Sequence, residues 1–131
     1  MIKQVFNVES YWKVVVYYDM DYNFFGSVER ELLALGVSEW AIDELYDIMF
    51  TGKAKAVTFS SLLEHISIVI FNPHKSMQDY IDSIVHEAEH IKQAMLKVYQ
   101  VEDRGEPPAY TIGYLISQMY QVFQHLICDC S

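Results

Sequence analysis

The stretch SMQDYIDSIVHEAEHIKQAMLKVYQ, residues 76–100, decides the fold of this chain. It opens with Ser76 and places Asp79 three residues later, a spacing typical of a capped helix start. The pattern predicts one long helix that ends near Gln100. Its apolar residues recur at steps of three and four and form a single stripe: Ile81, Ile84, Val85, Ala88, Ile91, Met95 and Val98.

A second amphipathic pattern follows the polar turn at 101–105. Pro107 and Pro108 fit the first turn of a helix, where a missing backbone N–H costs nothing, and the pattern runs to about residue 127. We therefore expect a helical hairpin in which the C-terminal helix is antiparallel to the long one. Its apolar stripe consists of Ile112, Leu115, Met119, Val122, Phe123 and Leu126.

Strand-like runs occupy the chain before this hairpin. The run YWKVVVYYDM at 11–20 is rich in β-branched and aromatic residues and suits a strand buried on both faces. Residues 55–60 and 65–72 read as a strand pair, and residues 1–8 can pair with the first run. The sequence thus predicts an α+β, zincin-like fold in which a small antiparallel sheet packs on the long helix.

Two short helices are expected between the first strand and the strand pair. Ser27 can cap one that stops at Gly36, and Ser38 can cap another that runs to about Phe50 and stops at Gly52.

Length, composition and charge limit the functions to consider. The 131 residues, 52% of them hydrophobic, fit a single domain over 1–131 without an internal repeat. The net charge of -9 argues against nucleic acid and anionic membranes as partners. No leader-like start or apolar run of about 20 residues is present, which predicts a cytoplasmic protein. Cys128 and Cys130 are too close in sequence to staple the fold, so we expect reduced thiols.

The candidate chemistry lies in HEAEH, residues 86–90 of the long helix. His86 and His90 point about 40 degrees apart on a helix, so both imidazoles can bind one tetrahedral zinc ion. Glu87 lies beside this pair and can take a proton from a metal-bound water. Glu89 lies about 80 degrees to the other side, as far from the pair as Glu87, so geometry alone does not choose the base. A solvated helix face is the alternative interpretation.

The C-terminal helix carries a second stripe opposite its apolar one, rich in tyrosine: Glu106, Tyr110, Gly113, Tyr114, Ser117, Gln121 and His125. If this stripe faces the histidines, Glu106 can be a third ligand and Tyr110 or Tyr114 can donate to an oxyanion. Amphipathic packing is the other interpretation of both tyrosines. The reach is short, because a helix that persisted to 101 would carry the chain about 16 Å beyond His90. Glu102 is the weaker alternative ligand.

The strings SIVHEAEHIKQ and GEPPAYTIGYL together resemble the small zincin-like metallopeptidase families of bacterial, phage and mobile-element genomes. The arrangement is similar to the gluzincins, and the resemblance covers about residues 66–127. It implies His86, His90 and Glu106 as zinc ligands and Glu87 as general base. The chain departs from the usual motif at Glu89, where an uncharged residue is customary.

Two functions are therefore expected from different classes. The first is a zinc-dependent metallohydrolase, a peptidase that acts on a peptide or protein substrate through a metal-activated water. The second is a noncatalytic interaction protein of a mobile element that retains the zincin-like scaffold. Five large residues of the N-terminal half would then either form a partner surface or fill the core: Trp12, Trp40, Tyr46, Met49 and Phe50.

Overall fold

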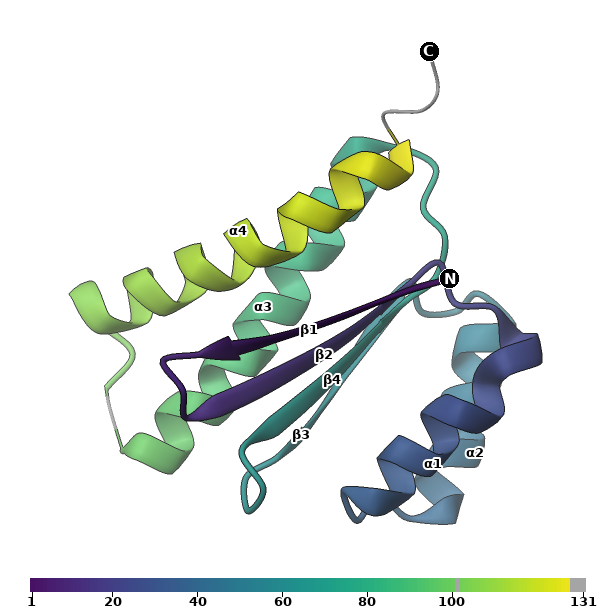
Figure 1. Ribbon diagram of the computed structural model, residues 1–131, viewed down its shortest axis with the longest axis horizontal. Coiled ribbons are helices and arrows are strands. Elements are labelled where there is room, and N and C mark those ends of the chain that lie inside the picture. Colours follow the sequence, from purple (N-terminus) through teal and green to yellow (C-terminus); the bar gives the residue numbers. More distant parts are fainter. Residues whose placement is uncertain (101, 128–131) are drawn as a thin grey trace.

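The computed structural model describes residues 1–100 and 102–127, and within these ranges it holds a four-stranded sheet and four α-helices. Two helices cover each face of the sheet (Figure 1). The α+β class is therefore confirmed. Cys128 and Cys130 lie outside the described residues. Along the chain the elements are β1 Ile2–Val8, β2 Trp12–Tyr18, the 3-10 helix η1 Tyr22–Phe24, α1 Phe25–Ala34, α2 Glu39–Phe50, β3 Ala56–Ser61, β4 Ile66–Phe71, α3 Met77–Tyr99 and α4 Glu106–Ile127.

The sheet is mixed, with the strand order β1-β2-β4-β3. β1 pairs antiparallel with β2, and β3 pairs antiparallel with β4, as the sequence predicts. The centre differs, because β2 and β4 run parallel with Val15 opposite Ile68. The expectation of an antiparallel sheet is therefore wrong at this pair. A parallel pair needs a long crossover, and α1 and α2 supply it between β2 and the β3–β4 hairpin.

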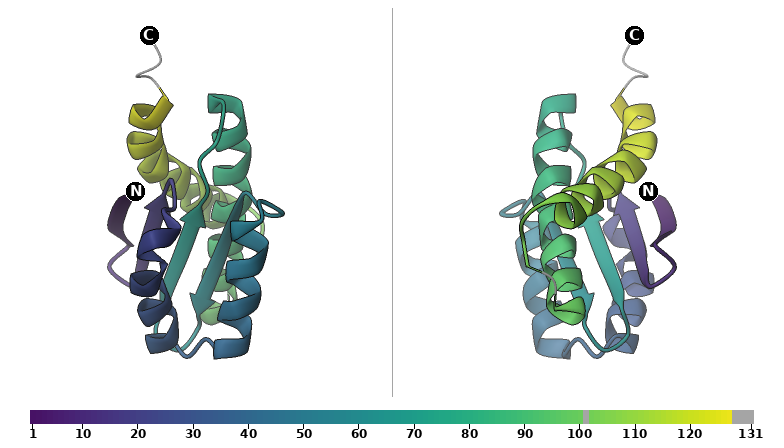
Figure 2. Two further views of the ribbon diagram at one scale, coloured as in Figure 1. Left: turned by 90° about the vertical axis from the view of Figure 1, so that its right-hand side faces the viewer. Right: turned by 90° about the vertical axis from the view of Figure 1, so that its left-hand side faces the viewer.

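Each face of the sheet has its own apolar core. Val14 and Val16 of β2 face α3 and α4, whereas Val15 and Tyr17 face α1 and α2. Figure 1 shows the three layers from the side, and Figure 2 looks onto the two faces of the sheet, with α1 and α2 in front on the left and α3 and α4 in front on the right. The prediction that the run at 11–20 is buried on both faces is confirmed, and the same double burial explains why β2 and β4 are almost continuously apolar.

The caps of the helices follow the sequence in two of three places. The hydroxyl of Ser38 accepts from the N–H of Ala41, and that of Ser76 accepts from the N–H of Asp79. The third cap is wrong, since α1 begins at Phe25 and Ser27 lies inside its first turn. The 3-10 helix η1 leads directly into α1, so this helix starts without a side-chain cap.

The buried face of α3 is rotated from the predicted stripe. Ile84, Ala88, Ile91 and Met95 are buried as expected, but Ile81 and Val85 are 41% and 44% exposed. In their place the helix buries side chains on the other flank of the stripe. These are Tyr80, Ser83 and Glu87. The rotation brings the flank that carries Glu87 against the sheet.

The last helix, α4, turns back toward the start of α3 and covers the sheet beside β1 (Figure 1). Leu115, Met119 and Phe123 bury its apolar stripe in the core shared with α3. The expected helical hairpin is thus present. None of the helices in residues 1–100 and 102–127 is both long and apolar enough to cross a bilayer.

The helical layer formed by α1 and α2 can be tested with two neighbouring leucines. Leu32 is fully buried against the sheet, whereas Leu33 is 40% exposed. We expect Leu32→Ala to lower the free energy of unfolding by about 2–5 kcal/mol, because it leaves a cavity between α1 and the sheet. Leu33→Ala is the matched control and should cost less than about 1 kcal/mol. Urea denaturation measures both, and equal losses would contradict this packing.

Candidate functional site

The two histidines of HEAEH lie side by side on the solvent side of α3. Their Nε2 atoms are 3.2 Å apart, and the rings are nearly perpendicular, with centroids 4.7 Å apart. Two nitrogens bound to one tetrahedral zinc ion at ordinary Zn–N distances are about 3.3 Å apart. His86 and His90 therefore have the spacing of a chelating pair, and both are exposed to an incoming ion.

Glu87 lies on the flank of α3 that faces the edge strand β3. Its side chain is 5% exposed, and its Oε1 accepts a hydrogen bond of 2.9 Å from the Thr58 hydroxyl. Its Oε2 lies 4.0 Å from Nε2 of His86. A carboxylate is thus held beside the imidazole pair, with one oxygen fixed by the sheet and the other directed toward His86.

Glu89 has a different environment, although the helical wheel places it as near to the histidines. Its carboxylate forms an ion pair of 2.9 Å with Lys92 and accepts a 3.0 Å hydrogen bond from Gln93. The Gln93 bond and then the Lys92 bond hold the pKa of Glu89 below its usual value. Glu89 is therefore engaged in a network of ion pairs and hydrogen bonds, and Glu87 is the glutamate next to His86.

The same network ties the segment after α3 to the helix. Lys92 also contacts Asp103 at 3.0 Å, and Gln93 donates to Asp103 at 2.7 Å. These bonds are the main cause of the lowered pKa of Asp103. Lys92 is 8% exposed, and its charge is balanced at the surface by the carboxylates of Glu89 and Asp103, whose side chains are 47% and 42% exposed.

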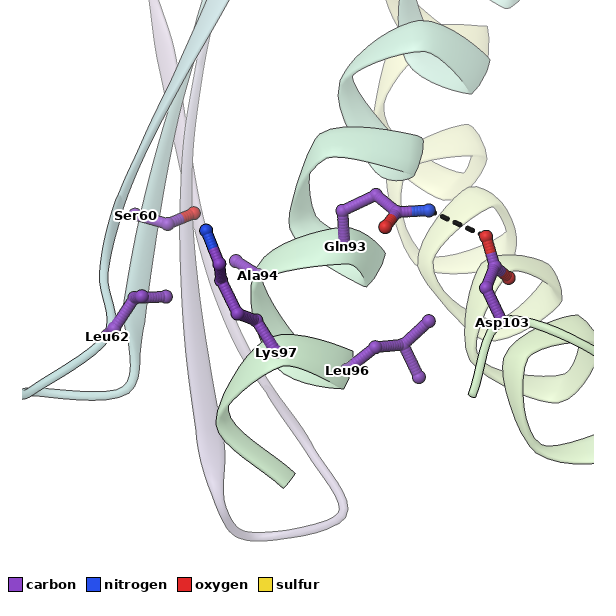
Figure 3. A pocket seen from close by; sticks show the side chains of 7 residues that line it. All are labelled: Ser60, Leu62, Gln93, Ala94, Leu96, Lys97 and Asp103. Carbon is purple, nitrogen blue, oxygen red and sulfur yellow. Dashed lines mark hydrogen bonds between the residues drawn. The ribbon is translucent and has the colours of Figure 1, made fainter. Parts of the chain in front are cut away.

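A groove runs between α3 and the edge strand β3. One cavity in it, of about 300 Å³, is lined by His86 and Glu87 together with Ser83 and Lys55. A second, of about 550 Å³, lies farther along α3 and is shown in Figure 3. There the Lys97 side chain extends toward Ser60, and Gln93 bonds Asp103 at the opposite wall. His86 and Glu87 thus line a cavity at the edge of the sheet, with the second cavity farther along the same helix.

Glu106 is not brought to the histidines. α3 persists to Tyr99, about 13 Å along the axis beyond His90, and Gln100 ends it in the left-handed region with φ of 56°. Glu106 begins α4 at that far end and lines another cavity with Met95 and Tyr99. Within residues 1–100 and 102–127, no third His, Cys, Asp or Glu side chain joins the pair to form a metal-binding group. Zinc ligation by Glu106 stays a prediction from the resemblance.

The two predicted tyrosines also lie at the far end of the hairpin. Tyr110 lines the same cavity as Glu106 and is 76% exposed. Tyr114 donates to the backbone carbonyl of Asn7 at 3.1 Å and packs edge-on against Phe6. In this arrangement neither hydroxyl is directed at the histidine pair, so the oxyanion role also stays a prediction.

A histidine that the sequence gives no role lies next to the candidate site. Nδ1 of His74 is 2.6 Å from the carbonyl oxygen of Asn72, and Nε2 is 2.7 Å from the Ser83 hydroxyl. Because a carbonyl only accepts, Nδ1 carries the proton, and Ser83 donates to Nε2 of the neutral ring. Ser83 lines the same cavity as Glu87. The sequence could have placed Ser83 next to Glu87, because the two residues are four apart and therefore lie on the same flank of the helix.

Comparison of the chain with family models, curated proteins and solved structures found no match. The resemblance of residues 66–127 to zincin-like peptidases therefore rests on the motif strings alone. The function has to be argued from the geometry of the histidine pair, Glu87 and the groove.

The contact that holds Glu87 can be tested through stability. Thr58→Val removes the hydroxyl that donates to Glu87 while keeping the shape of the side chain. We expect it to lower the free energy of unfolding by about 1–3 kcal/mol, because a buried carboxylate loses its donor. Thr58→Ser, which keeps the hydroxyl, should cost clearly less. If both variants unfold at the same urea concentration, the hydrogen bond does not stabilise the fold.

The pH dependence of stability should report on His74. Burial lowers the pKa of His74, against the opposing effects of its bond to Asn72 and of the nearby Asp19 and Asp79. The unfolded chain, with a histidine pKa of about 6.5, then binds more protons than the folded one. The free energy of unfolding should therefore fall as the pH drops below about 6.5.

The matched variants are His74→Gln and His125→Gln, the second of which replaces an exposed imidazole on α4. His74→Gln should flatten the dependence between roughly pH 6.5 and 5, above the range in which carboxylates titrate. His125→Gln should leave it unchanged. A wild-type slope retained by His74→Gln would refute the assignment.

Proposed function

We propose that this chain is a zinc-dependent hydrolase that cleaves peptide bonds. The observation that carries the proposal is the chelating distance of 3.2 Å between His86 and His90, next to a buried glutamate at the edge of a groove. Buried carboxylates are rare, and one held beside two potential metal ligands is a feature of catalytic sites.

His86 and His90 would hold the metal through their Nε2 atoms. Bound zinc would supply a polarised water at near-neutral pH and a Lewis acid for the carbonyl. The resemblance adds Glu106 as the third ligand. Glu106 would reach the histidines only if α3 ended earlier, near Lys97, and the chain turned back toward His90.

Glu87 is the proposed proton acceptor, at Oε2. Its other oxygen, Oε1, is occupied by the Thr58 hydroxyl, which orients the carboxylate without neutralising it. Oε2 would accept the proton of the attacking water and return it to the leaving amine. Thr58 thus acts through Glu87 as a positioning residue.

The groove supports a polypeptide as the substrate. β3 is an edge strand, and its outer side carries backbone groups that can pair with an extended chain. The cavities along α3 would take the side chains of such a segment. The net charge of -9 disfavours acidic peptides.

A noncatalytic scaffold is the second candidate, and the separation of Glu106 from the histidines favours it. In that case the pair would bind metal weakly or not at all, and the protein would act through a surface. Trp40 and Phe50, which are 74% and 60% exposed on α2, are the aromatic side chains available for a partner there. This is the proposed interaction protein of a mobile element.

Metal content and hydrolysis distinguish the two candidates. Untagged wild-type protein should contain stoichiometric zinc by elemental analysis, and His86→Ala should not. Against a peptide library, Glu87→Gln should keep zinc but lower hydrolysis by roughly a hundredfold, because an amide cannot accept the water proton. Glu89→Gln is the matched control and should do less.

Two results would count against the hydrolase. Wild-type protein without stoichiometric zinc would leave only the scaffold, as would a zinc-loaded protein that cleaves none of the library. Loss of activity in Glu89→Gln with activity kept in Glu87→Gln would show that the base is assigned to the wrong glutamate.

A further inference from the structure

The tyrosine stripe of α4 lines cavities at the C-terminal end of α3. Two adjoining cavities, of about 370 and 260 Å³, lie where the β1–β2 turn, the end of α3 and the start of α4 meet. Both are lined by Glu9, Tyr110 and Thr111. The larger adds Tyr99 and Glu106, and the smaller adds Tyr114. Together they form a trough, called here the tyrosine trough.

The lining of the tyrosine trough has a definite chemistry. It presents three tyrosine rings and two carboxylates, and among the described residues that line it there is no lysine or arginine. Aromatic faces attract cations through the ring quadrupole, and carboxylates attract them through charge. An anion would be repelled by the carboxylates, and a neutral ligand would gain no charge attraction, whereas an organic cation is attracted by both the rings and the carboxylates.

Two of the rings are fixed in place before any ligand binds. Tyr114 is held by its bond to the Asn7 carbonyl and by Phe6. Tyr99 packs edge-on against Tyr11 and Trp12, with centroids 6.4 and 6.3 Å away. Preset rings lose little conformational entropy on binding. The third ring, Tyr110, is 76% exposed between the two cavities and can fold over an occupant.

We infer that the tyrosine trough binds an arginine side chain of a partner polypeptide. A guanidinium is planar, stacks on tyrosine and can bond a carboxylate through two N–H groups, which suits Glu9 and Glu106 better than an ammonium does. The trough is open and elongated across both cavities, so a side chain that enters from a bound chain fits it better than a compact free ligand. In the structure this site is apart from His86 and His90 and does not need hydrolase activity, but it uses Glu106 where α4 begins and therefore excludes Glu106 as a zinc ligand.

A titration of the 131-residue chain with blocked tripeptides tests the inference. Acetyl-Gly-Arg-Gly-amide should cause saturable NMR shifts at the trough, in residues 8–10, 95–99 and 106–114. The lysine analogue should bind more weakly, and the citrulline analogue, which has the shape of arginine without its charge, should not saturate. Methylguanidinium, a free cation, should also bind more weakly than the peptide.

Matched variants locate the binding. Glu9→Gln and Glu106→Gln should each lower the affinity for the arginine peptide roughly tenfold, since each removes one charged hydrogen-bond acceptor. Glu44→Gln removes an exposed carboxylate from α2, on the opposite side of the sheet, and should leave the affinity unchanged. Tyr110→Ala should weaken binding, and Tyr110→Phe, which keeps the ring face, should not.

Four results would overturn the inference. They are the absence of saturable shifts with the arginine peptide, equal binding of the citrulline peptide, equal binding of methylguanidinium, and an equal loss of affinity in Glu44→Gln. The last would mean that the negative charge of the whole protein attracts the peptide. The amide spectra of the variants verify that each remains folded.

Discussion

The parallel pairing of β2 with β4 is the constraint on which the rest of the structure depends. It requires a crossover, and α1 with α2 provides one over a single face of the sheet. The opposite face is then left for α3 and α4, which follow β4 directly. Because β4 occupies the centre, its hairpin partner β3 becomes the edge strand. The groove between β3 and α3 follows from this one pairing, and so does the contact between Thr58 and Glu87.

Within that frame α3 carries three kinds of side chain on adjoining flanks. Its apolar face packs in the core, Glu87 meets the sheet edge, and His86 with His90 faces solvent. A buried carboxylate with one side-chain donor is a costly way to join a helix to a sheet, since an apolar pair of similar volume is often as stable or more so. Stability alone therefore does not account for Glu87. Its position next to the imidazoles, with Oε2 directed toward His86, fits the proposed role of Glu87 as a proton acceptor.

Features that depend on local residue spacing can be predicted from this sequence. The pairing of strands and the path of the chain after α3 cannot. The bounds of α3, its Ser76 cap and the proximity of the two histidines all follow from helical spacing. The parallel pair was missed because a doubly buried strand has the same apolar run whichever partner it takes. The distance of Glu106 from the histidines does not follow from helical spacing, because it depends on where α3 ends, and the last turn of α3 packs through Tyr99 against Tyr11 and Trp12. If α3 ended near Lys97, the residues that follow could bring Glu106 back to the histidine pair.

The end of α3 at Tyr99 therefore determines two features at once. It keeps Glu106 away from the histidine pair, and it brings Glu106 to Tyr99, Tyr110 and Glu9. Residues of one helical stripe therefore line a cavity at the C-terminal end of α3, apart from the histidines that the same stripe was expected to face. The two proposed sites would take ligands of the same sign, because an imidazole pair can chelate a metal cation and the tyrosine trough would take a guanidinium. The net charge of -9 attracts cations to the whole protein, and so to the middle of α3, where the histidines lie, and to its C-terminal end, where the tyrosine trough lies.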